Sequence, residues 1–302
     1  MIRLFFVADS RIADSILTLK FDHFLDPQPN QTYICFGLGH GHEPIDLLQI
    51  YQNHGIDTSN MKVIFDRQLM EQNLLPEFDY YQFSGWIAQQ FFKLLALDQV
   101  NSDRVLIQDC DTFSLAPYQY FDGSTPKYYV IENTTQSLEY YQYVKKFTGQ
   151  ARQTSHCFVT EFMPVLKKDW VALKNHIEQT YGCNWLLAME QVFSADVNSN
   201  PNNSSPIWFS EYELLGNLGL QKNPNAGFQF QNRLSIYDDT TGFWKHHPDH
   251  YTVEEFLKLD NIDKFNCVCI KSSTAVEEEH LAPILDSIMS QIFPLVSNKE
   301  PQ

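Results

Sequence analysis

The sequence predicts an α/β fold in which a mostly parallel central sheet carries helices on both faces. Short apolar runs alternate with helical patterns along the first 112 residues, as is typical of strands joined by crossover helices. The chain has 302 residues, of which 43% are hydrophobic and 14% aromatic. This content suffices for one large core, and α/β enzymes of this length often form a single continuous sheet.

The N-terminal part of the chain supplies most of the predicted sheet. We expect strands at Arg3–Ala8, Gln31–Phe36, Met61–Phe65, Arg104–Gln108 and Tyr128–Ile131. We expect helices at Ile12–Phe24, Pro44–His54 and Gly85–Leu97. In the last of these, Trp86, Phe91 and Leu94 recur at helical spacing, which more often reflects core packing than ligand contacts.

The C-terminal part has a less regular pattern. Helices are expected at Leu138–Thr148, Lys168–Tyr181, Asn184–Val192, from Ser210 onward and at Glu277–Phe293, and strands at Cys157–Met163 and Phe228–Ile236. The polar stretch Asp196–Pro206 is rich in Asn, Ser and Pro and predicts a loop. The flanking segments are too short to fold alone, so we expect one catalytic domain over 1–302.

The charge balance narrows the choice of partners. The formal net charge is -16, which would repel a phosphodiester backbone, so nucleic acid is not an expected partner. The first apolar run, Leu4 to Ala8, is too short for a signal peptide, and no segment has the eighteen or so apolar residues that a membrane span needs. We expect a cytoplasmic protein, and this composition still allows peripheral association with the inner membrane.

The most informative segment runs from Ser102 to Pro117. An apolar strand ends there in Asp109-Cys110-Asp111, a D-x-D pattern. Ligands of open α/β sheets bind beyond the carboxyl ends of the strands, and two carboxylates there can hold Mn²⁺ or Mg²⁺ against diphosphate oxygens. For the pattern taken alone, a pair of surface carboxylates that caps the next turn is an equally good interpretation.

Four blocks carry a resemblance to known proteins. Thr112, Phe113 and Pro117 after the D-x-D resemble the donor-metal region of GT-A glycosyltransferases. More narrowly, the chain resembles the bacterial DUF6492 family of glycosyltransferase-like proteins. The blocks are SGWIAQQFFKLLAL (Ser84–Leu97), LIQDCDTF (Leu106–Phe113), FVTEFMPV (Phe158–Val165) and FSEYELLGN (Phe209–Asn217). Glu161 departs from the smaller residue expected in the third block.

The resemblance implies roles for the donor-binding residues. The end of the first strand receives the nucleoside in GT-A proteins, which points to Asp9, although capping of the next helix explains this residue equally well. Arg11 is a candidate for the diphosphate. Gln90 and Lys93 lie on or beside a helix face that the resemblance directs at the donor, and Lys93 would meet phosphate as a point charge. A solvated face is the competing interpretation of Lys93.

The resemblance also implies a catalytic carboxylate and a third metal ligand. Inverting GT-A enzymes commonly use a carboxylate at a helix start as general base, and Glu211 is the first candidate. Glu161 and Glu190 are reserves, and Asp196 is a weaker one. The metal site of such enzymes often includes a C-terminal histidine, for which His247 is favoured over its neighbours His246 and His250.

Taken together, these observations predict a metal-dependent glycosyltransferase. Its donor would be a nucleotide-sugar, with a uridine diphosphate sugar as the first expectation, and its acceptor a hydroxyl of a bacterial surface glycan or glycolipid. Residues 1–132 would bind donor and metal, and residues 133–302, with the C-terminal helix, would bind the acceptor. Two alternatives remain open: a metal-dependent nucleotidyl- or phosphotransferase, and a non-catalytic sugar- or nucleotide-binding domain.

Overall fold

The structure is a computed structural model. It describes residues 1–8, 11–37, 45–73, 85–132, 137–199, 209–237, 250–252, 255 and 265–271. The predicted C-terminal helix at 277–293 lies outside these residues, as do the histidines at positions 40, 42, 246 and 247.

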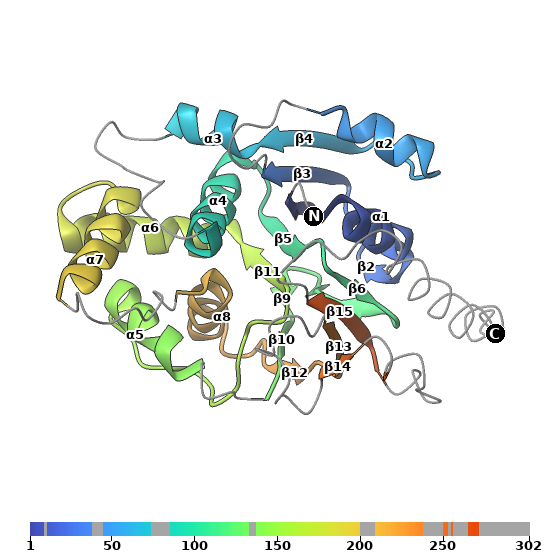
Figure 1. The fold of residues 1–302 in the computed structure, drawn as a ribbon. Helices are drawn as coiled ribbons and strands as arrows, with labels where there is room; N and C mark the ends of the chain where they lie inside the picture. Colours follow the sequence, from blue (N-terminus) through green and yellow to red (C-terminus); the bar gives the residue numbers. More distant parts are fainter. Residues whose placement is uncertain are drawn as a thin grey trace.

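The central sheet has five strands in the order β11-β5-β1-β3-β4. They are β1 (Ile2–Ala8), β3 (Gln31–Gly37), β4 (Met61–Phe65), β5 (Arg104–Asp109) and β11 (Phe162–Leu166). All neighbours pair in parallel except β11, which runs antiparallel to β5. The mostly parallel α/β sheet predicted from the alternating pattern is therefore confirmed (Figure 1).

The two faces of the sheet bury alternate residues of the same strand. In β1, Leu4 and Phe6 belong to one hydrophobic cluster, whereas Phe5 and Val7 belong to another. This alternation is what a strand buried on both sides requires, and it explains the continuous apolar run in the sequence. Figure 1 shows α3 and α4 on one side of the sheet and α1 and α2 on the other.

Helices cover both faces of the central sheet, and four of the described helices lie between residues 137 and 222. The described helices are α1 (Ile12–Lys20), α2 (Leu47–Asn53), α3 (Asp66–Asn73), α4 (Gly85–Gln99), α5 (Ser137–Thr148), α6 (Lys167–Tyr181), α7 (Trp185–Ser199) and α8 (Glu211–Lys222). A short 3₁₀ turn, Asp22–Phe24, follows α1. Among the described residues, no helix has the length and apolar character needed to cross a lipid bilayer.

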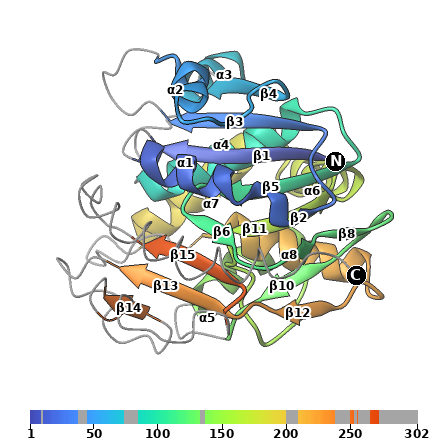
Figure 2. The same cartoon turned by 90° about the vertical axis from the view of Figure 1, so that its right-hand side faces the viewer.

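A second sheet in the order β14-β13-β15-β6 lies next to the central one (Figure 2). Its strands are β6 (Thr112–Ser114), β13 (Arg233–Tyr237), β14 (His250–Thr252) and β15 (Cys267–Lys271). Three two-stranded pairs complete the described strands: β10 (Tyr128–Val130) with β12 (Phe228–Phe230), β2 (Leu25–Asp26) with β7 (Tyr118–Gln119), and β8 (Phe121–Asp122) with β9 (Thr125–Pro126). Because β6 directly follows the D-x-D turn, the second sheet begins at the predicted metal site.

Two strand predictions were wrong in their bounds. The strand expected at Cys157–Met163 begins only at Phe162, because Glu161 has a left-handed backbone with φ 61° and interrupts the extended run. The strand expected at Phe228–Ile236 is two strands, β12 and β13, which belong to different sheets. Hydrophobic alternation alone does not reveal where a chain passes from one sheet to another.

The predicted loop at Asp196–Pro206 was wrong in its first part, because α7 continues to Ser199. Asp196 pairs with Lys146 of α5, and Phe193 is fully buried, so tertiary contacts sustain the helix beyond Val192. The rest of the predicted loop lies outside the described residues. The sequence interpretation also missed α3, whose eight residues carry a mostly polar pattern.

Close packing of α8 on the segment before β11 gives a first testable prediction. A Cβ added at Gly216 would lie 2.4 Å from Cγ of the Phe158 ring, and this ring is fully buried. Alanine normally stabilises a helix interior by about 1 kcal/mol relative to glycine. We expect the opposite sign here, because Gly216→Ala should lower the free energy of unfolding by about 1–3 kcal/mol through overpacking.

Chemical denaturation of the Gly216→Ala variant measures this loss. In the Phe158→Ala background, where Cγ and the rest of the ring are absent, the same substitution should cost much less, so the two changes should be strongly non-additive. Equal losses in both backgrounds would contradict the packing assigned to this contact.

Candidate functional site

The D-x-D motif lies at the carboxyl end of β5, at the edge where the parallel strands finish. Asp109 is the last residue of β5, and Asp111 lies in the turn to β6. The Asp109 backbone N–H donates to the Glu161 carbonyl at 3.0 Å, and the Cys110 N–H donates to the Phe6 carbonyl at 3.0 Å. These backbone hydrogen bonds, to β1 and to the residue before β11, fix the position of the backbone that carries the two carboxylates.

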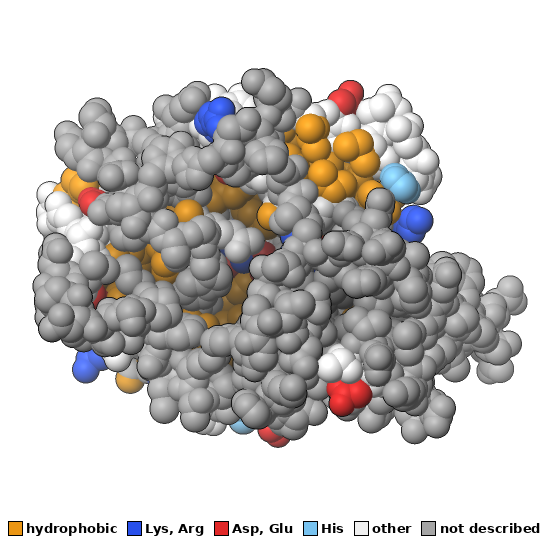
Figure 3. All heavy atoms as spheres, viewed as in Figure 1, with side chains coloured by type: hydrophobic (Ala, Val, Ile, Leu, Met, Phe, Trp, Pro, Cys, Tyr) orange, Lys and Arg blue, Asp and Glu red, His pale blue; other side chains and the backbone are white. Residues whose placement is uncertain are grey.

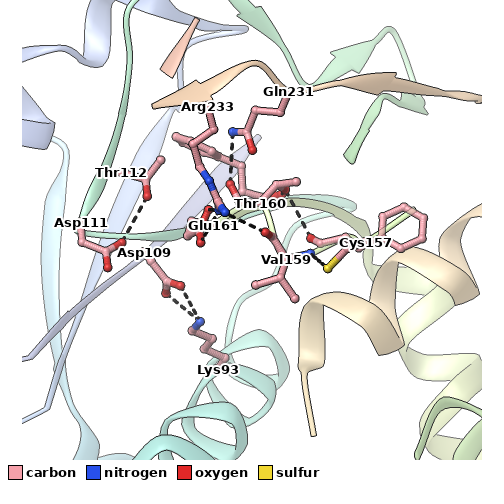
Figure 4. Close-up of polar contacts among 12 residues, drawn as sticks. Lys93, Asp109, Asp111, Thr112, Cys157, Val159, Thr160, Glu161, Gln231 and Arg233 are labelled. Carbon is pink, nitrogen blue, oxygen red and sulfur yellow. Dashed lines mark hydrogen bonds and ion pairs between the residues drawn. The ribbon is translucent and has the colours of Figure 1, made fainter. Parts of the chain in front are cut away.

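Lys93 reaches from α4 to this strand end and joins two carboxylates. Its ammonium nitrogen lies 2.7 Å and 2.9 Å from the two carboxylate oxygens of Asp109. The same nitrogen lies 2.7 Å from Oε1 of Glu211, the first residue of α8. Figure 4 shows Lys93 rising from its helix toward Asp109. Three segments far apart in sequence thus meet at one ammonium group.

These three groups are buried and electrostatically linked. The side chains of Lys93 and Glu211 are 2% and 0% exposed, whereas that of Asp109 is 18% exposed. Burial alone would lower the pKa of Lys93, but the carboxylates of Asp109 and Glu211 raise it above its usual value, so the lysine stays charged. Burial raises the pKa of Glu211, Lys93 acts in the opposite direction, and the negative charge of Asp109, which shares this cation, raises it.

The second carboxylate of the motif has a basic neighbour of its own. A guanidinium nitrogen of Arg11 lies 3.9 Å from the Asp111 carboxylate, and another lies 2.6 Å from Asp14. Burial raises the pKa of the Asp14 carboxyl, with Arg11 acting in the opposite direction. Thr112 also donates its hydroxyl to Asp111 at 3.2 Å. Asp111, 17% exposed, is held less tightly by its cation than Asp109 is by Lys93.

A third buried ion pair lies on the other side of Asp109. Arg233 of β13 places one guanidinium nitrogen 2.9 Å and 2.7 Å from the two carboxylate oxygens of Glu161 (Figure 4). Glu161 is 2% exposed and has the left-handed φ of 61°. The left-handed backbone conformation costs a non-glycine residue about 1–2 kcal/mol of conformational free energy, and residues with such strain are often found at functional sites. The ion pair between Arg233 and Glu161 therefore connects the second sheet to Glu161, whose backbone carbonyl accepts the hydrogen bond from the Asp109 N–H.

Two buried polar atoms beside Lys93 have no hydrogen-bond partner within the described part of the chain. They are Oε2 of Glu211 and the hydroxyl of Tyr212, whereas Oδ1 of Asp109 and Oε1 of Glu211 each lie 2.7 Å from the Lys93 ammonium. Lys93 offsets the charge of the carboxylates and lies 4.4 Å from the centre of the Tyr212 ring. Buried acceptors are normally satisfied, so these atoms suit a ligand that brings hydroxyl donors or a cation. In Figure 3 the face is hollowed where α4, β11 and α8 meet in Figure 1, with hydrophobic side chains around it.

The structure brings together most of the predicted site residues that it describes. Lys93, Asp109 and Glu211 lie together at the strand end, with Asp111 and Arg11 beside them, and they form the candidate site. Gln90 is buried on the same helix as Lys93. The interpretation of Lys93 as part of a solvated face was wrong, because its side chain is buried between two carboxylates.

Other candidates lie elsewhere. Asp196 pairs with Lys146 through the helix contact described above, and Glu190 lies on α7. Two predicted site residues, at positions 9 and 247, lie outside the described residues, and of His250 the structure describes only the backbone. Within the described ranges, no group of three histidine, cysteine or acidic side chains is placed to hold a metal ion.

The sequence interpretation missed three residues of this neighbourhood. Asp14 follows Arg11 by three positions, which is the spacing of a helical ion pair. Arg233 is the single charged residue of a short strand, RLSIY, a pattern that signals a buried partner. Tyr212, next to Glu211, left no signal, because a tyrosine in an apolar helix is common in any core.

Solved glycosyltransferase structures resemble this fold at low sequence identity. The galactosyltransferase LgtC, in complex with donor and acceptor sugar analogues, is 13% identical, and the match covers 97% of this chain and 96% of that one with a TM-score of 0.45. Mouse xyloside xylosyltransferase 1 is 11% identical over 81% of this chain and 89% of its own, with a TM-score of 0.43. The bifunctional glycosyltransferase WbbM is 10% identical over 96% of this chain, with a TM-score of 0.48, but the match spans only 49% of WbbM.

Sequence comparison gives a more direct result. No curated protein matches the chain. One family model, described as a family of unknown function, matches residues 8–291 and so covers the strand end, α4 and α8 together. This protein is therefore a member of the DUF6492 family.

Proposed function

We propose that this protein is a metal-dependent glycosyltransferase that moves a sugar from a nucleotide-sugar to a hydroxyl of a bacterial surface glycan or glycolipid. The observation that carries the proposal is the meeting of Asp109, Asp111, Lys93 and Glu211 at the carboxyl end of a parallel strand. This edge is where open α/β sheets bind nucleotides. Carboxylates beside a buried lysine at this edge suit a diphosphate that is bound together with a cation.

The charges of the site favour a divalent cation. Among the residues that the structure describes, five carboxylates lie around the strand end: Asp14, Asp109, Asp111, Glu161 and Glu211. Three cations accompany them: Arg11, Lys93 and Arg233. If all are ionised, two negative charges remain, which one divalent ion would balance. Buried unbalanced charge is costly, so a site of this composition gains from such an ion.

The oxygen ligands fit Mg²⁺ or Mn²⁺. Mg²⁺ in nucleotide sites is commonly held by one or two carboxylates together with substrate phosphates and water. Asp109 and Asp111 would supply such a pair, and the predicted third ligand, His247, lies outside the described residues. When bound, the ion would neutralise charge that develops on the leaving nucleoside diphosphate.

The chain's own cations would hold the donor. Lys93 stays charged between Asp109 and Glu211, and its place at the strand end suits contact with a phosphate oxygen of the donor. Arg11 follows β1 and lies beside Asp111, which suits contact with the other phosphate. The predicted nucleoside contact, Asp9, follows β1 directly in the sequence and lies outside the described residues.

Glu211 is proposed as the general base toward the acceptor hydroxyl, which would make the reaction inverting. It lies in the first turn of α8, and its Oε2 has no partner among the described residues. The Glu211 side chain is fully buried, so an acceptor hydroxyl would contact it only from inside the candidate site. Bound substrate would then exclude water from this carboxylate. In the same scheme residues 1–132 bind donor and metal, and residues 133–302 bind the acceptor.

Calorimetry of UDP and GDP binding with and without Mn²⁺ tests the proposal. We expect one of the two nucleotides to bind, and to bind at least about tenfold more tightly with the metal. Product analysis with the matching nucleotide-sugars should then show cleavage at the sugar carbon. Cleavage between the phosphates would instead identify a nucleotidyl- or phosphotransferase, and the absence of binding under every condition would overturn the proposal.

A further inference from the structure

Lys93 pairs with both carboxylate oxygens of Asp109, the atoms through which this residue would bind a metal ion. Its ammonium nitrogen lies within 2.9 Å of both carboxylate oxygens, so the lysine covers the inner edge of the carboxylate. Arg11, in contrast, lies 3.9 Å from Asp111. One carboxylate of the D-x-D pair is thus tightly paired with a cation of the chain, whereas the other is only loosely paired.

We propose that Lys93 is a tethered cation that competes with the divalent ion for Asp109, so that metal and nucleotide bind together rather than the metal binding first. This inference rests on the proposed function, and it adds an order of binding. Without nucleotide, the ammonium satisfies Asp109, and an incoming divalent ion meets a positive charge close to its ligand. With nucleotide, a diphosphate oxygen offers the ammonium a new partner and releases Asp109.

The surroundings of Lys93 provide for such a shift. The lysine already contacts Glu211 at 2.7 Å, and its nitrogen lies over the ring of Tyr212 at 4.4 Å. These contacts remain when the bond to Asp109 is given up, so the charge is never left unpaired in the interior. A lysine side chain has four flexible carbons, which allows a small movement of its ammonium group without a movement of α4.

The competition has a thermodynamic consequence. If most free molecules hold Asp109 with Lys93, the apparent metal affinity is reduced by the fraction in which the carboxylate is available. Diphosphate binding removes this penalty, so nucleotide and metal must each strengthen the binding of the other by the same factor. Removal of the ammonium should abolish this part of the coupling.

Mn²⁺ binding to the Lys93→Gln variant, measured by calorimetry and by the paramagnetic resonance of free Mn²⁺, tests the inference. Without nucleotide we expect Mn²⁺ to bind about tenfold or more tightly than to the parent protein. The ratio of Mn²⁺ dissociation constants without and with UDP or GDP should fall by a similar factor. Lys93→Arg keeps the charge and should bind Mn²⁺ as weakly as the parent.

Two further variants complete the design. Lys93→Gln leaves Glu211 without its cation and can unfold the protein, so Lys93→Gln with Glu211→Gln removes both charges and should show the same gain in metal affinity. Lys174→Gln breaks the ion pair with Asp98, at 2.8 Å, and serves as a control that should leave Mn²⁺ binding unchanged. Unchanged or weaker metal binding in both Lys93→Gln proteins would overturn the inference.

Failure of this inference can be told apart from failure of the proposed function. The measurements without nucleotide need only a metal site, so tighter Mn²⁺ binding by Lys93→Gln would support the competition even if no nucleotide bound. Metal-dependent nucleotide binding by the parent, with no effect of Lys93→Gln on Mn²⁺ alone, would preserve the proposed function and reject the competition.

Discussion

Replacement of Asp109 and Asp111 by asparagine should remove the metal-dependent part of nucleotide binding and lower kcat/KM by about a thousandfold or more. Asparagine keeps the shape of each side chain but loses the charge that a divalent ion requires. Stabilisation of a leaving diphosphate by a metal ion amounts to several kcal/mol, and about 4 kcal/mol corresponds to a thousandfold change in rate. Calorimetry with Mn²⁺ and initial-rate kinetics on the same protein measure both effects.

The fold should survive this double substitution. Both side chains are partly exposed, at 18% and 17%, and Glu211 remains as the partner of Lys93. The matched control is Asp122→Asn, which removes a carboxylate that is 72% exposed and lies in the β8–β9 pair. Normal metal-dependent binding in the double variant would show that the two aspartates only cap the turn between β5 and β6.

The sequence predicted the central sheet well, because strands buried on both faces read as continuous apolar runs. The run at Arg104–Gln108 is one example, and β5 differs from it only by the addition of Asp109. Strand order, in contrast, depends on contacts between distant segments. Nothing local to Phe162–Leu166 shows that it joins this sheet antiparallel to β5, or that β12 and β13 separate into two sheets.

The candidate site was predictable where its residues stand in a local pattern. Asp109 ends a strand with Asp111 in the turn after it, and Glu211 begins a helix after the capping residue Ser210, so both locations can be read from sequence. The ion pairs were not predictable, because they join residues far apart in the chain. Lys93 meets Glu211 across 118 positions, and Arg233 meets Glu161 across 72, so only the folded chain reveals that each charge is buried with its partner.

Replacement of Glu211 by glutamine should lower kcat by about a hundredfold to ten-thousandfold while the dissociation constant of the metal-bound nucleotide changes little. Glutamine retains the shape and an acceptor oxygen but cannot take a proton from the attacking hydroxyl, and general base catalysis usually contributes this much. Glu213→Gln is the matched control from the same helical turn. Glu213 accepts from the Phe158 N–H at 2.8 Å and from Asn217 at 3.1 Å, so its loss should affect stability rather than turnover.

The pH profile separates catalysis by Glu211 from support of Lys93. Burial raises the pKa of Glu211, so a base at this position should be protonated and inactive at a pH where an exposed glutamate is already ionised. The rate of the parent should therefore rise with pH through an acid limb that lies above the ordinary glutamate range, and the limb should vanish in Glu211→Gln. If Glu211 instead only positions Lys93, the limb should persist in the variant, and the loss should appear mainly in KM for the donor, because a displaced ammonium weakens nucleotide binding before it slows the chemical step.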